Sequence, residues 1–381
     1  MNKIIFWEPC ISPHKHDFMI AVSNVIPNIE IICCAAMDIP DDRKKLGWVI
    51  QNKNAIKTII APSKLQIKNI VCDCSKSQTI HIFSGIRHIS TITTALNLVR
   101  KNNCRFAIMS EPRAKEGWKG KLRYLESLLS EGWLRNKCEF ILAIGANGSP
   151  WFKSVGYSSK KIHPFAYFID VPTLPNLPQQ TEQKSKKILR IGYIGRLVTM
   201  KGIFDLIEAI KILSIDVVFV VAGSGHDEEK LKSKCKQYGI FLDFRGVVPI
   251  HSIGALLLEI DILVLASLSS DGWGVVVSEA LMSGVPVIAT PCVGASLMLN
   301  EPLFGRIVSK NNPQEIANKI NDIANSSLTS SRSKLERQTL ARCRLSAEAG
   351  AYYFKEILDF HLYKGKYPEP FFTYSLTTLS M

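Results

Sequence analysis

The hydrophobic pattern of the first 170 residues alternates between short apolar runs and longer amphipathic stretches. Short apolar runs are typical of buried strands, and apolar residues at every third or fourth position predict helices. The predicted strands are Lys3–Trp7, Ile29–Ala35, Ile80–Phe83, Arg105–Ser110, Phe140–Ile144 and Ile162–Phe168. The predicted helices are His16–Val25, Ser90–Lys101, Gly117–Leu134 and Asn147–Val155. This alternation predicts a parallel sheet with helices on both faces.

A second sheet of the same kind is predicted after a break at Val171–Lys187. The break holds Pro172, Pro175 and Pro178 and ends in a polar run without periodicity, which is typical of a linker. Strands are then predicted at Leu189–Ile194, Val217–Ala222, Phe241–Arg245, Ile262–Ala266, Pro286–Ala289 and Arg306–Val308. Helices are predicted at Gly202–Leu213, Asp227–Tyr238, Ile253–Leu258, Val275–Ser283, Pro313–Ala324 and Ser346–Tyr363. The last of these could pack against either domain.

The length and composition agree with two globular domains. The chain has 381 residues, of which 46% are hydrophobic and 21% charged, so a disordered, collagen-like or disulfide-scaffold protein is excluded. We predict an N-terminal domain at residues 1–170, a linker at 171–187, a second domain at 188–345, and a C-terminal helix and tail at 346–381.

Three features predict a cytoplasmic location. The most apolar stretch, Leu256–Ala266, holds Glu259 and Asp261 and is unsuited to crossing a bilayer. The first residues lack an apolar segment long enough for a secretory signal. The ten cysteines are scattered, without zinc-site spacing, and are expected to be reduced thiols.

The positive charge is concentrated in the first half of the chain. Residues 1–170 carry 24 Lys and Arg against 13 Asp and Glu, a net charge of +11, whereas residues 171–381 carry a net charge of +3. Such a basic surface attracts nucleic acid, anionic lipid or a phosphorylated substrate.

Two glycine-containing segments follow predicted strands of the second domain. In GYIGRLVTMKG, Gly192–Gly202, Gly195 allows a tight turn, and Arg196 and Lys201 supply two cations that suit a diphosphate. In SSDGWGVVVSEA, Ser269–Ala280, two glycines open a helix whose start favours an anion. Carboxylates eight residues apart flank this second segment and suit sugar hydroxyls; they are Asp271 and Glu279.

Together these segments resemble the retaining glycosyltransferases of family 4. Five motifs match in order, namely GYIGRLVTMKG, VVAGSGHDEEKLK, FRGVVP, LVLASLSSDGWGVVVSEALMSGVPVIAT and LFGRIVSKNNPQEIANKI. The resemblance implies an α/β protein with the GT-B fold, in which two facing Rossmann-like domains with parallel sheets enclose a cleft. It also implies a hexosyl transfer from a nucleotide-sugar donor to a saccharide or lipid-linked acceptor in cell-surface polysaccharide synthesis.

The resemblance assigns roles to residues of the second domain. Arg196 and Lys201 would contact the donor diphosphate, Glu279 the ribose, and Asp271 the transferred sugar, although the family usually has Glu at the position of Asp271. We therefore expect Arg196, Lys201 and Asp271 to be the catalytic residues. The expected donor-binding residues are Gly195, Gly272, Trp273, Gly274, Val275 and Glu279.

The first domain matches the family less well. The glycine-rich turn after the first strand is replaced by EPCISPHKHD, and MSEPR lacks a histidine that the family often has there. The acceptor-side candidates are His14, His16, Arg87 and Glu111.

The expected reaction needs neither a metal nor a cofactor. The chain contains no D-x-D motif, and side-chain cations can neutralise the departing diphosphate in place of a divalent ion. No side chain stands out as a nucleophile, which favours a same-face path in which the leaving phosphate helps to deprotonate the acceptor.

Three alternatives remain at the level of the sequence. A nicotinamide-dependent oxidoreductase is disfavoured because no complete G-x-G-x-x-G is present. A sugar-nucleotide epimerase on the same fold is a closer alternative. A basic nucleic-acid-binding protein is disfavoured because no recognised binding pattern is found, and we expect no nucleic-acid partner.

The segment Arg113–Lys137 combines apolar and basic residues. Trp118, Leu122, Leu125, Leu129 and Trp133 recur every three or four positions and favour a helix packed on the core. Its basic end could instead rest on the inner face of an anionic membrane, where the protein would be peripherally bound. The basic residues concerned are Lys115, Lys119, Lys121 and Arg123.

Overall fold

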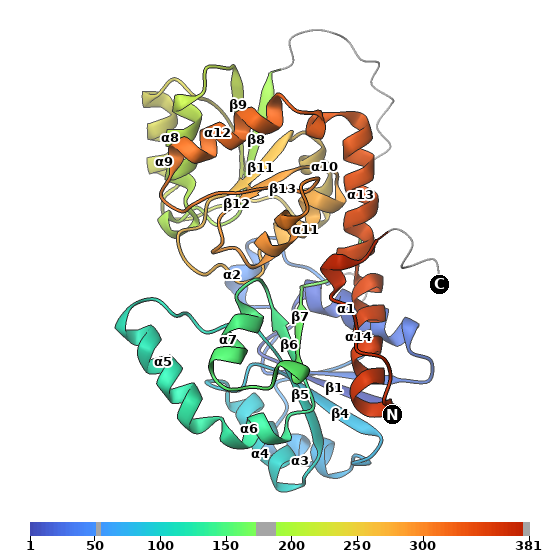
Figure 1. Ribbon diagram of the computed structural model, residues 1–381. Coiled ribbons are helices and arrows are strands. Elements are labelled where there is room, and N and C mark those ends of the chain that lie inside the picture. Colours follow the sequence, from blue (N-terminus) through green and yellow to red (C-terminus); the bar gives the residue numbers. More distant parts are fainter. Residues whose placement is uncertain (51–54, 173–187, 376–381) are drawn as a thin grey trace. The chain divides into compact units, whose positions relative to one another are not determined.

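The computed structural model describes residues 1–50, 55–172 and 188–375, which form two compact units (Figure 1). Unit 1 consists of Met1–Lys44, Trp48–Asp170 and Leu345–Tyr374. Unit 2 is built on Val171–Arg344 and also includes Lys45–Gly47. Most of the predicted linker, residues 173–187, lies outside the described residues.

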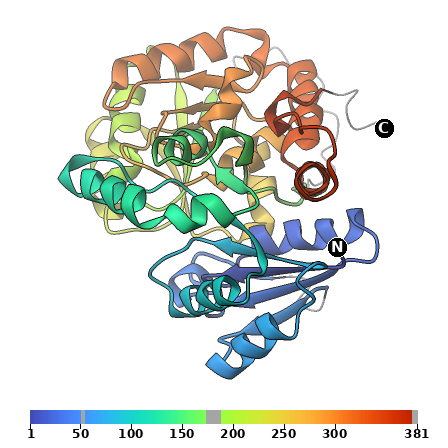
Figure 2. The same cartoon turned by 60° about the horizontal axis from the view of Figure 1, so that its bottom comes forward.

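Unit 1 is a parallel sheet of seven strands in the order β3-β2-β1-β4-β5-β6-β7. Its strands are β1 (Lys3–Glu8), β2 (Glu30–Ala35), β3 (Lys57–Ile60), β4 (Thr79–Ser84), β5 (Arg105–Ser110), β6 (Ile141–Ile144) and β7 (Ile162–Phe165). Its helices are α1 (Pro13–Val25), α2 (Asp41–Lys44), α3 (Lys64–Cys72), α4 (Ser90–Lys101), α5 (Gly117–Ser130), α6 (Gly132–Lys137), α7 (Gly148–Ser154) and α14 (Ala347–Tyr363). The helices cover both faces of the sheet (Figure 2).

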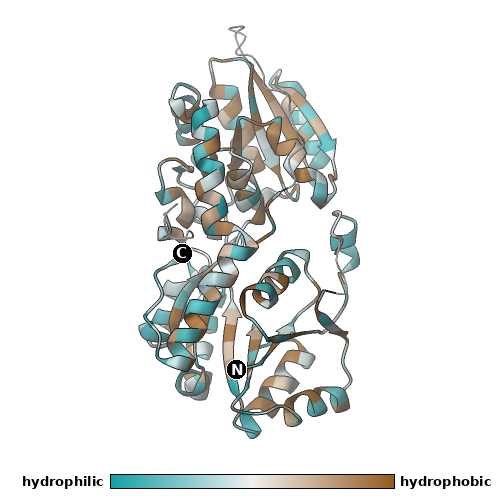
Figure 3. Ribbon diagram, turned by 90° about the vertical axis from the view of Figure 1, so that its right-hand side faces the viewer, coloured by the Kyte–Doolittle hydropathy of each residue, from teal (hydrophilic) through white to brown (hydrophobic). Residues whose placement is uncertain are grey.

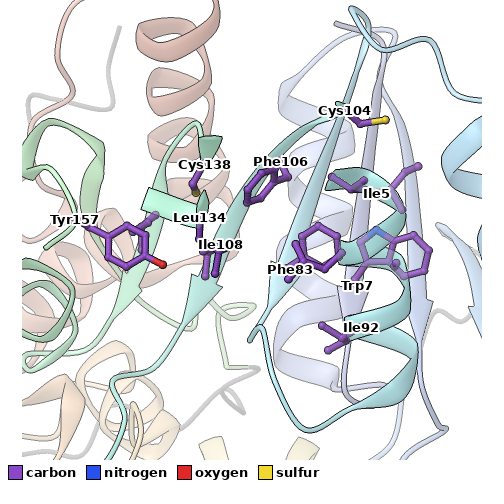
Figure 4. Packing of buried hydrophobic residues seen from close by; sticks show 14 of the residues in the cluster. Ile5, Trp7, Phe83, Ile92, Cys104, Phe106, Ile108, Leu134, Cys138 and Tyr157 are labelled. Carbon is purple, nitrogen blue, oxygen red and sulfur yellow. The ribbon is translucent and has the colours of Figure 1, made fainter. Parts of the chain in front are cut away.

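The core of unit 1 lies on both faces of this sheet. On one face Trp7, Phe83 and Phe106 pack with Ile92 of α4 (Figure 4). The Trp7 indole N–H donates to His81 Nδ1 at 3.1 Å. On the other face, the ring of Phe354 in α14 contacts those of Phe6, Phe18 and Phe140. The last helix of the chain therefore packs in unit 1, against α1.

Unit 2 is a parallel sheet of six strands in the order β10-β9-β8-β11-β12-β13. Its strands are β8 (Leu189–Ile194), β9 (Val217–Ala222), β10 (Phe241–Gly246), β11 (Ile262–Leu265), β12 (Val287–Ala289) and β13 (Gly305–Ile307). Its helices are α8 (Ile203–Ile212), α9 (Glu228–Gln237), α10 (Ile253–Leu258), α11 (Val275–Met282), α12 (Pro313–Ala324) and α13 (Ser331–Leu345). The central strands of both units are mainly hydrophobic, whereas the edge strand β10 carries Asp243 and Arg245 (Figure 3).

Four elements of the structure were not predicted from the sequence, and each has a weak apolar pattern; they are α2, β3, α3 and α13. The edge strand β3 is only partly buried, and α3 follows it after a short polar turn. Helix α13 has no apolar stripe and is anchored instead by Arg337. The buried guanidinium of this arginine donates to the carbonyl oxygens of Leu303, Gly284 and Leu328 at 2.7, 2.6 and 2.8 Å.

The predicted helix Gly117–Leu134 is in fact two helices, α5 and α6, separated at Glu131. The buried Glu131 carboxylate accepts hydrogen bonds from Tyr157 Oη at 2.8 Å and from Arg87 Nη1 at 2.7 Å. Gly132 follows it and begins α6. These contacts fix the break, which an apolar spacing running through both helices did not reveal.

None of the ten cysteines forms a disulfide. Within residues 1–50, 55–172 and 188–375, no helix combines the length and the hydrophobicity needed to cross a membrane.

Candidate functional site

The order of the strands in unit 2 reverses between β8 and β11. From β8 the chain proceeds outward through β9 and β10, and from β11 it proceeds in the opposite direction through β12 and β13. Ligands of open parallel sheets bind at such a switch point, outside the carboxyl ends of the strands. The loops that leave β8 and β11 meet at this edge, where Leu268 N donates to Met200 O at 2.9 Å.

Gly202 allows these two loops to lie in contact. It has φ of +69°, and a Cβ atom at this position would lie 1.8 Å from the carbonyl oxygen of Ala266. A side chain is excluded both by this clash and by the left-handed backbone. The glycine that ends the first motif therefore sets the position of Lys201 against the end of β11.

Lys201 and Asp271 form an ion pair at this edge. The Nζ of Lys201 contacts Oδ1 of Asp271, and Ser267 Oγ donates to the other carboxylate oxygen at 2.6 Å. Both charged groups are largely shielded from solvent, so salt screens their attraction less than at an open surface. The sequence predicted both residues for the site, but it did not predict that they pair with each other.

Arg196 differs from Lys201 because its charged group forms no ion pair with the described residues. Its side chain is exposed, and among the described residues its guanidinium has no hydrogen-bond or ion-pair partner. Its backbone is fixed, since Tyr193 Oη donates to the Arg196 carbonyl at 2.7 Å. A fork of donors is thus available for an anion beside the fixed Lys201.

The second glycine segment forms the start of α11. Gly274 is the N-cap residue with φ of +79°, and Val275 is the first residue of the helix. Gly272 also has a positive φ, of +46°, and its carbonyl accepts from Gly294 N at 2.8 Å. Val277 N donates to Gly274 O at 2.9 Å, and the amides that precede it at the start of α11 are suited to an anion.

Trp273, predicted to bind the donor, has its side chain inside the protein. Its indole is buried, and its N–H donates to Ser278 Oγ at 2.9 Å. The backbone carbonyl of Trp273 accepts from Ala295 N at 2.7 Å. The tryptophan ring therefore stabilises the loop from within, and the whole residue is buried.

Glu279 lies one turn into α11 and is half-buried. Among the described residues its carboxylate has no hydrogen-bond or ion-pair partner. Desolvation by burial raises its pKa from 4.5 to about 7. A half-buried carboxylate without a partner can accept hydrogen bonds from a ligand, and binding would then replace the solvation lost on folding.

Unit 1 has a polar cluster at the equivalent position of its own sheet, where the strand order reverses between β1 and β4. Glu8 ends β1 and Ser84 ends β4, and Ser84 Oγ donates to Glu8 Oε1 at 2.7 Å. Lys15 Nζ, from α1, lies 2.6 Å from Glu8 Oε2 and 2.7 Å from Ser84 Oγ. We call Glu8, Lys15 and Ser84 the switch-point triad of unit 1.

Glu111, an acceptor-side candidate, lies close to this triad. Tyr167 Oη donates to Glu111 Oε1 at 2.9 Å, and Lys15 Nζ lies 5.8 Å from the centre of the Tyr167 ring. The sequence prediction missed Glu8, Lys15, Ser84 and Tyr167 as site residues. The available signal was that Glu8 and Ser84 directly follow two predicted strands, Lys3–Trp7 and Ile80–Phe83.

The other acceptor-side candidates have different surroundings. His14 packs edge-on against the Trp48 ring, and burial lowers its pKa to about 4. His16 is buried, and neither ring nitrogen has a hydrogen-bond partner among the described residues. Arg87 forms ion pairs with Glu131 at 2.7 Å and Glu126 at 3.4 Å, so its charge holds α5 and α6 in place.

In the parts of the chain that the structure describes, no three His, Cys, Asp or Glu side chains gather in an arrangement that could hold a metal ion.

Residues 176–341 match the model of the family described as "Glycosyl transferases group 1". The chain is 42% identical over 114 residues to the putative teichuronic acid biosynthesis glycosyltransferase TuaC of Bacillus subtilis, which is 30% of this chain and 26% of that protein. It is 27% identical over 137 residues to the putative colanic acid biosynthesis glycosyltransferase WcaL of Salmonella typhimurium, covering 33% and 34%. The matched segments thus span about a quarter to a third of these relatives.

Solved structures resemble the chain over almost all of its length. HepE of Anabaena, in complex with UDP and glucose, matches with a TM-score of 0.69 at 14% identity, covering 94% of this chain and all of that one. The lipopolysaccharide outer core galactosyltransferase WaaB matches with a TM-score of 0.68 at 16% identity, covering 93% and 99%. The fold is therefore α/β with two Rossmann-like units, as in GT-B glycosyltransferases.

Proposed function

We propose that the protein is a glycosyltransferase that moves a hexose from a nucleotide-sugar donor to a saccharide or lipid-linked acceptor in cell-surface polysaccharide synthesis. The observation that carries this proposal is the group of Arg196, Lys201 and Asp271 at the switch point of unit 2. These residues lie inside the segment that matches the group 1 glycosyltransferases. The relatives named for teichuronic and colanic acid synthesis support the polysaccharide role.

We assign the donor to unit 2. The cations of Arg196 and Lys201 suit a diphosphate, and the first turn of α11 offers it further N–H groups. Glu279 is assigned to the ribose hydroxyls, and Asp271 to a hydroxyl of the transferred sugar. HepE, which has the same fold, was solved with UDP and glucose, which supports a uridine diphosphate sugar as the first donor to test.

The ion pair gives Lys201 and Asp271 linked roles in this proposal. In the free protein Asp271 holds the Lys201 ammonium at the switch point, and Ser267 fixes the carboxylate. An ammonium has three N–H donors, so it can bind the diphosphate while one of them still faces Asp271. The other Asp271 oxygen can exchange Ser267 for a sugar hydroxyl.

Transfer breaks the bond between the anomeric carbon and the diphosphate oxygen, and the electron pair leaves with the diphosphate. Arg196 and Lys201 stabilise the negative charge that develops there, and preorganised donors of this kind are a major source of catalysis. We propose retention of configuration. The acceptor oxygen bonds to the anomeric carbon on the face that the diphosphate leaves, and its proton passes to the departing diphosphate.

We assign the acceptor to the switch-point triad of unit 1 together with Glu111 and Tyr167. Carboxylates, hydroxyls and an ammonium in one place can accept from and donate to several sugar hydroxyls. The proposed location is the cytoplasm, where nucleotide sugars and the inner face of the membrane would both be accessible.

Transfer is expected to proceed in the presence of a chelator, because Arg196 and Lys201 supply the positive charge that a divalent ion would otherwise provide. The measurement is the initial transfer rate with EDTA and with added Mg²⁺ or Mn²⁺. Rates within about twofold of each other support a metal-independent reaction. Loss of activity in EDTA that either metal restores would contradict it.

The function as a whole is tested with a panel of sugar nucleotides. One of them should raise the melting temperature, because a ligand that binds only the folded state stabilises it, by about 2.7 kcal/mol at a hundredfold excess over Kd. The same compound should then transfer its sugar to a saccharide or polyprenyl-linked acceptor. Failure of every sugar nucleotide to bind would contradict the proposal, and conversion of the donor into its epimer without an acceptor would identify an epimerase instead.

A further inference from the structure

Helix α5 exposes a row of large apolar side chains. Trp118, Leu122, Leu125 and Leu129 are spaced four, three and four residues apart, so they lie on one face of the helix. Their exposed fractions are 68%, 55%, 49% and 81%. The apolar spacing predicted that these residues and Trp133 pack on the core. The structure contradicts this for the four residues of α5, whereas Trp133 in α6 packs on the core against Phe106.

The opposite face of α5 attaches the helix to unit 1 through small and polar groups and through the Tyr124 ring, which packs against Trp151. The helix residues that are buried are Gly120 and Ser127. Ser127 Oγ accepts from Arg113 Nη1 at 2.9 Å, and the Ser127 carbonyl accepts from Arg135 Nη1 at 3.2 Å. Gly120 approaches the loop so closely that a Cβ atom would lie 2.0 Å from Lys115 O. These contacts hold this side of α5 against unit 1 and leave the apolar side of the helix exposed.

The exposed apolar residues of α5 are also unusual because several of them lie on one face of a single helix. Other large exposed side chains stand on separate elements, such as Leu65 on α3, Phe241 on β10 and Leu335 on α13. Single exposed apolar residues are normal, whereas several on one face mark a surface that binds a partner or a membrane. In Figure 1 α5 is the long helix of unit 1 in green-blue.

The charges around this apolar row are basic. Lys115, Lys119 and Lys121 are exposed, and among the described residues none of them forms an ion pair. Lys119 Nζ lies 5.6 Å from the centre of the Trp118 ring, so charge and aromatic surface adjoin. The nearby Glu126 carboxylate is already paired with Arg113 at 2.7 Å.

Arg123 was predicted to act with these lysines, but its side chain lies on another side of the helix. It is half-buried, and its Nη1 donates to the Ala114 carbonyl at 3.4 Å. It therefore belongs to the attached side of the helix. The exposed basic residues of this segment are the three lysines. Lys119 and Lys121 lie on α5 beside the apolar row, and Lys115 precedes the helix, with its Nζ 5.6 Å from the centre of the Trp151 ring.

We propose that α5 binds the surface of an anionic lipid bilayer, with Trp118, Leu122, Leu125 and Leu129 inserted among the lipids and Lys115, Lys119 and Lys121 on the headgroups. A helix with one apolar face and flanking lysines has the chemistry of an interfacial membrane anchor. Indole rings lie well at the boundary between lipid and water, and lysine stems can reach outward from it. The lysines are complementary in charge to anionic headgroups, so we assign this surface to a lipid bilayer. This inference does not depend on sugar transfer.

The test is sedimentation of the full chain with vesicles, without donor or acceptor. Vesicles of phosphatidylglycerol and phosphatidylcholine should pellet the protein, vesicles of phosphatidylcholine alone should not, and 0.5 M salt should release it. Two variants should reduce the bound fraction at least tenfold, namely Leu122→Ser/Leu125→Ser/Leu129→Ser and Lys115→Gln/Lys119→Gln/Lys121→Gln. The matched control, Lys64→Gln/Leu65→Ser/Lys68→Gln on α3 of the same unit, should bind like the wild type.

Several outcomes would overturn the proposal. Absence of wild-type pelleting with anionic vesicles would do so, as would equal pelleting of both α5 variants. Sedimentation velocity without lipid tests whether a second copy of the chain covers the apolar row instead. If the wild type forms a dimer and the leucine variant does not, the apolar row is a dimer interface. Thermal melting checks folding, and the variants should melt like the wild type because the replaced side chains are exposed.

Discussion

Replacing Arg196 by alanine is expected to lower the transfer rate by about 10²–10³-fold, without a change in melting temperature. Loss of one preorganised donor to a developing negative charge typically has an effect of this size. Stability should not change, because the Arg196 guanidinium is exposed and no described residue pairs with it. The control is Arg332→Ala on α13, an arginine with an 89% exposed side chain.

Lys201→Ala should cause a similar loss of rate but also lower the stability. It removes the partner of the half-buried Asp271 carboxylate, and a charge left without a partner in such a place is costly. The double variant Lys201→Ala/Asp271→Asn should recover part of the melting temperature and none of the rate. This pattern separates a role in folding from a role in catalysis.

A near wild-type rate in Arg196→Ala or Lys201→Ala would remove the assignment of that residue to the diphosphate. Recovery of rate in the double variant would indicate that Lys201 acts only by neutralising Asp271. Donor affinity should be measured beside the rate, because a cation that acts mainly on the departing diphosphate changes the rate more than the affinity.

The parallel strands were the part of the fold that the sequence predicted best. The predicted bounds of β5, β8 and β9 agree with the structure; β9 is a continuous apolar run, and in β8 only Arg190 interrupts the nonpolar residues with a charge. Elements held by other forces were missed. Helix α13 depends on the hydrogen bonds of Arg337, which hydrophobic periodicity does not detect.

In the candidate sites, too, the sequence predicted what local motifs determine and missed the contacts that depend on the fold. The glycine motifs indicated Gly272 and Gly274, because backbone positions with a positive φ restrict the residue type. The pairing of Lys201 with Asp271 joins residues 70 positions apart, and local sequence carries no signal for it. The switch-point triad of unit 1 was missed for the same reason, since Glu8 and Ser84 come together only through the strand order.

The expected result for Glu279→Gln is a free protein that is more stable at pH 8 and binds the donor more weakly. Burial raises the pKa of Glu279 from 4.5 to about 7 in the folded protein, so folding opposes its ionisation. An amide has no charge to desolvate. The gain in unfolding free energy at pH 8 should be on the order of 1–3 kcal/mol, since each pKa unit corresponds to about 1.4 kcal/mol.

The pH dependence of this gain has a defined sign. Below about pH 4.5 the carboxyl group is protonated in both states, and the difference between variant and wild type is small. Between pH 4.5 and 7 the unfolded chain loses the proton while the folded protein keeps it, so the wild type loses stability as the pH rises. Above pH 7 Glu279 is ionised in both states, and the difference is constant.

Thermal melting of wild type and Glu279→Gln from pH 4.5 to 8 measures this difference, with the exposed Glu336→Gln on α13 as the control. Parallel melting curves across this range would show that burial does not raise the pKa of Glu279. Donor binding at pH 8 completes the test, because a neutral amide accepts weaker hydrogen bonds from ribose hydroxyls than a carboxylate does. If the variant gains stability and keeps full donor affinity, Glu279 does not contact the donor. If the variant gains stability and loses donor affinity, the Glu279 carboxylate binds the donor, and this contact offsets the cost of burying its charge.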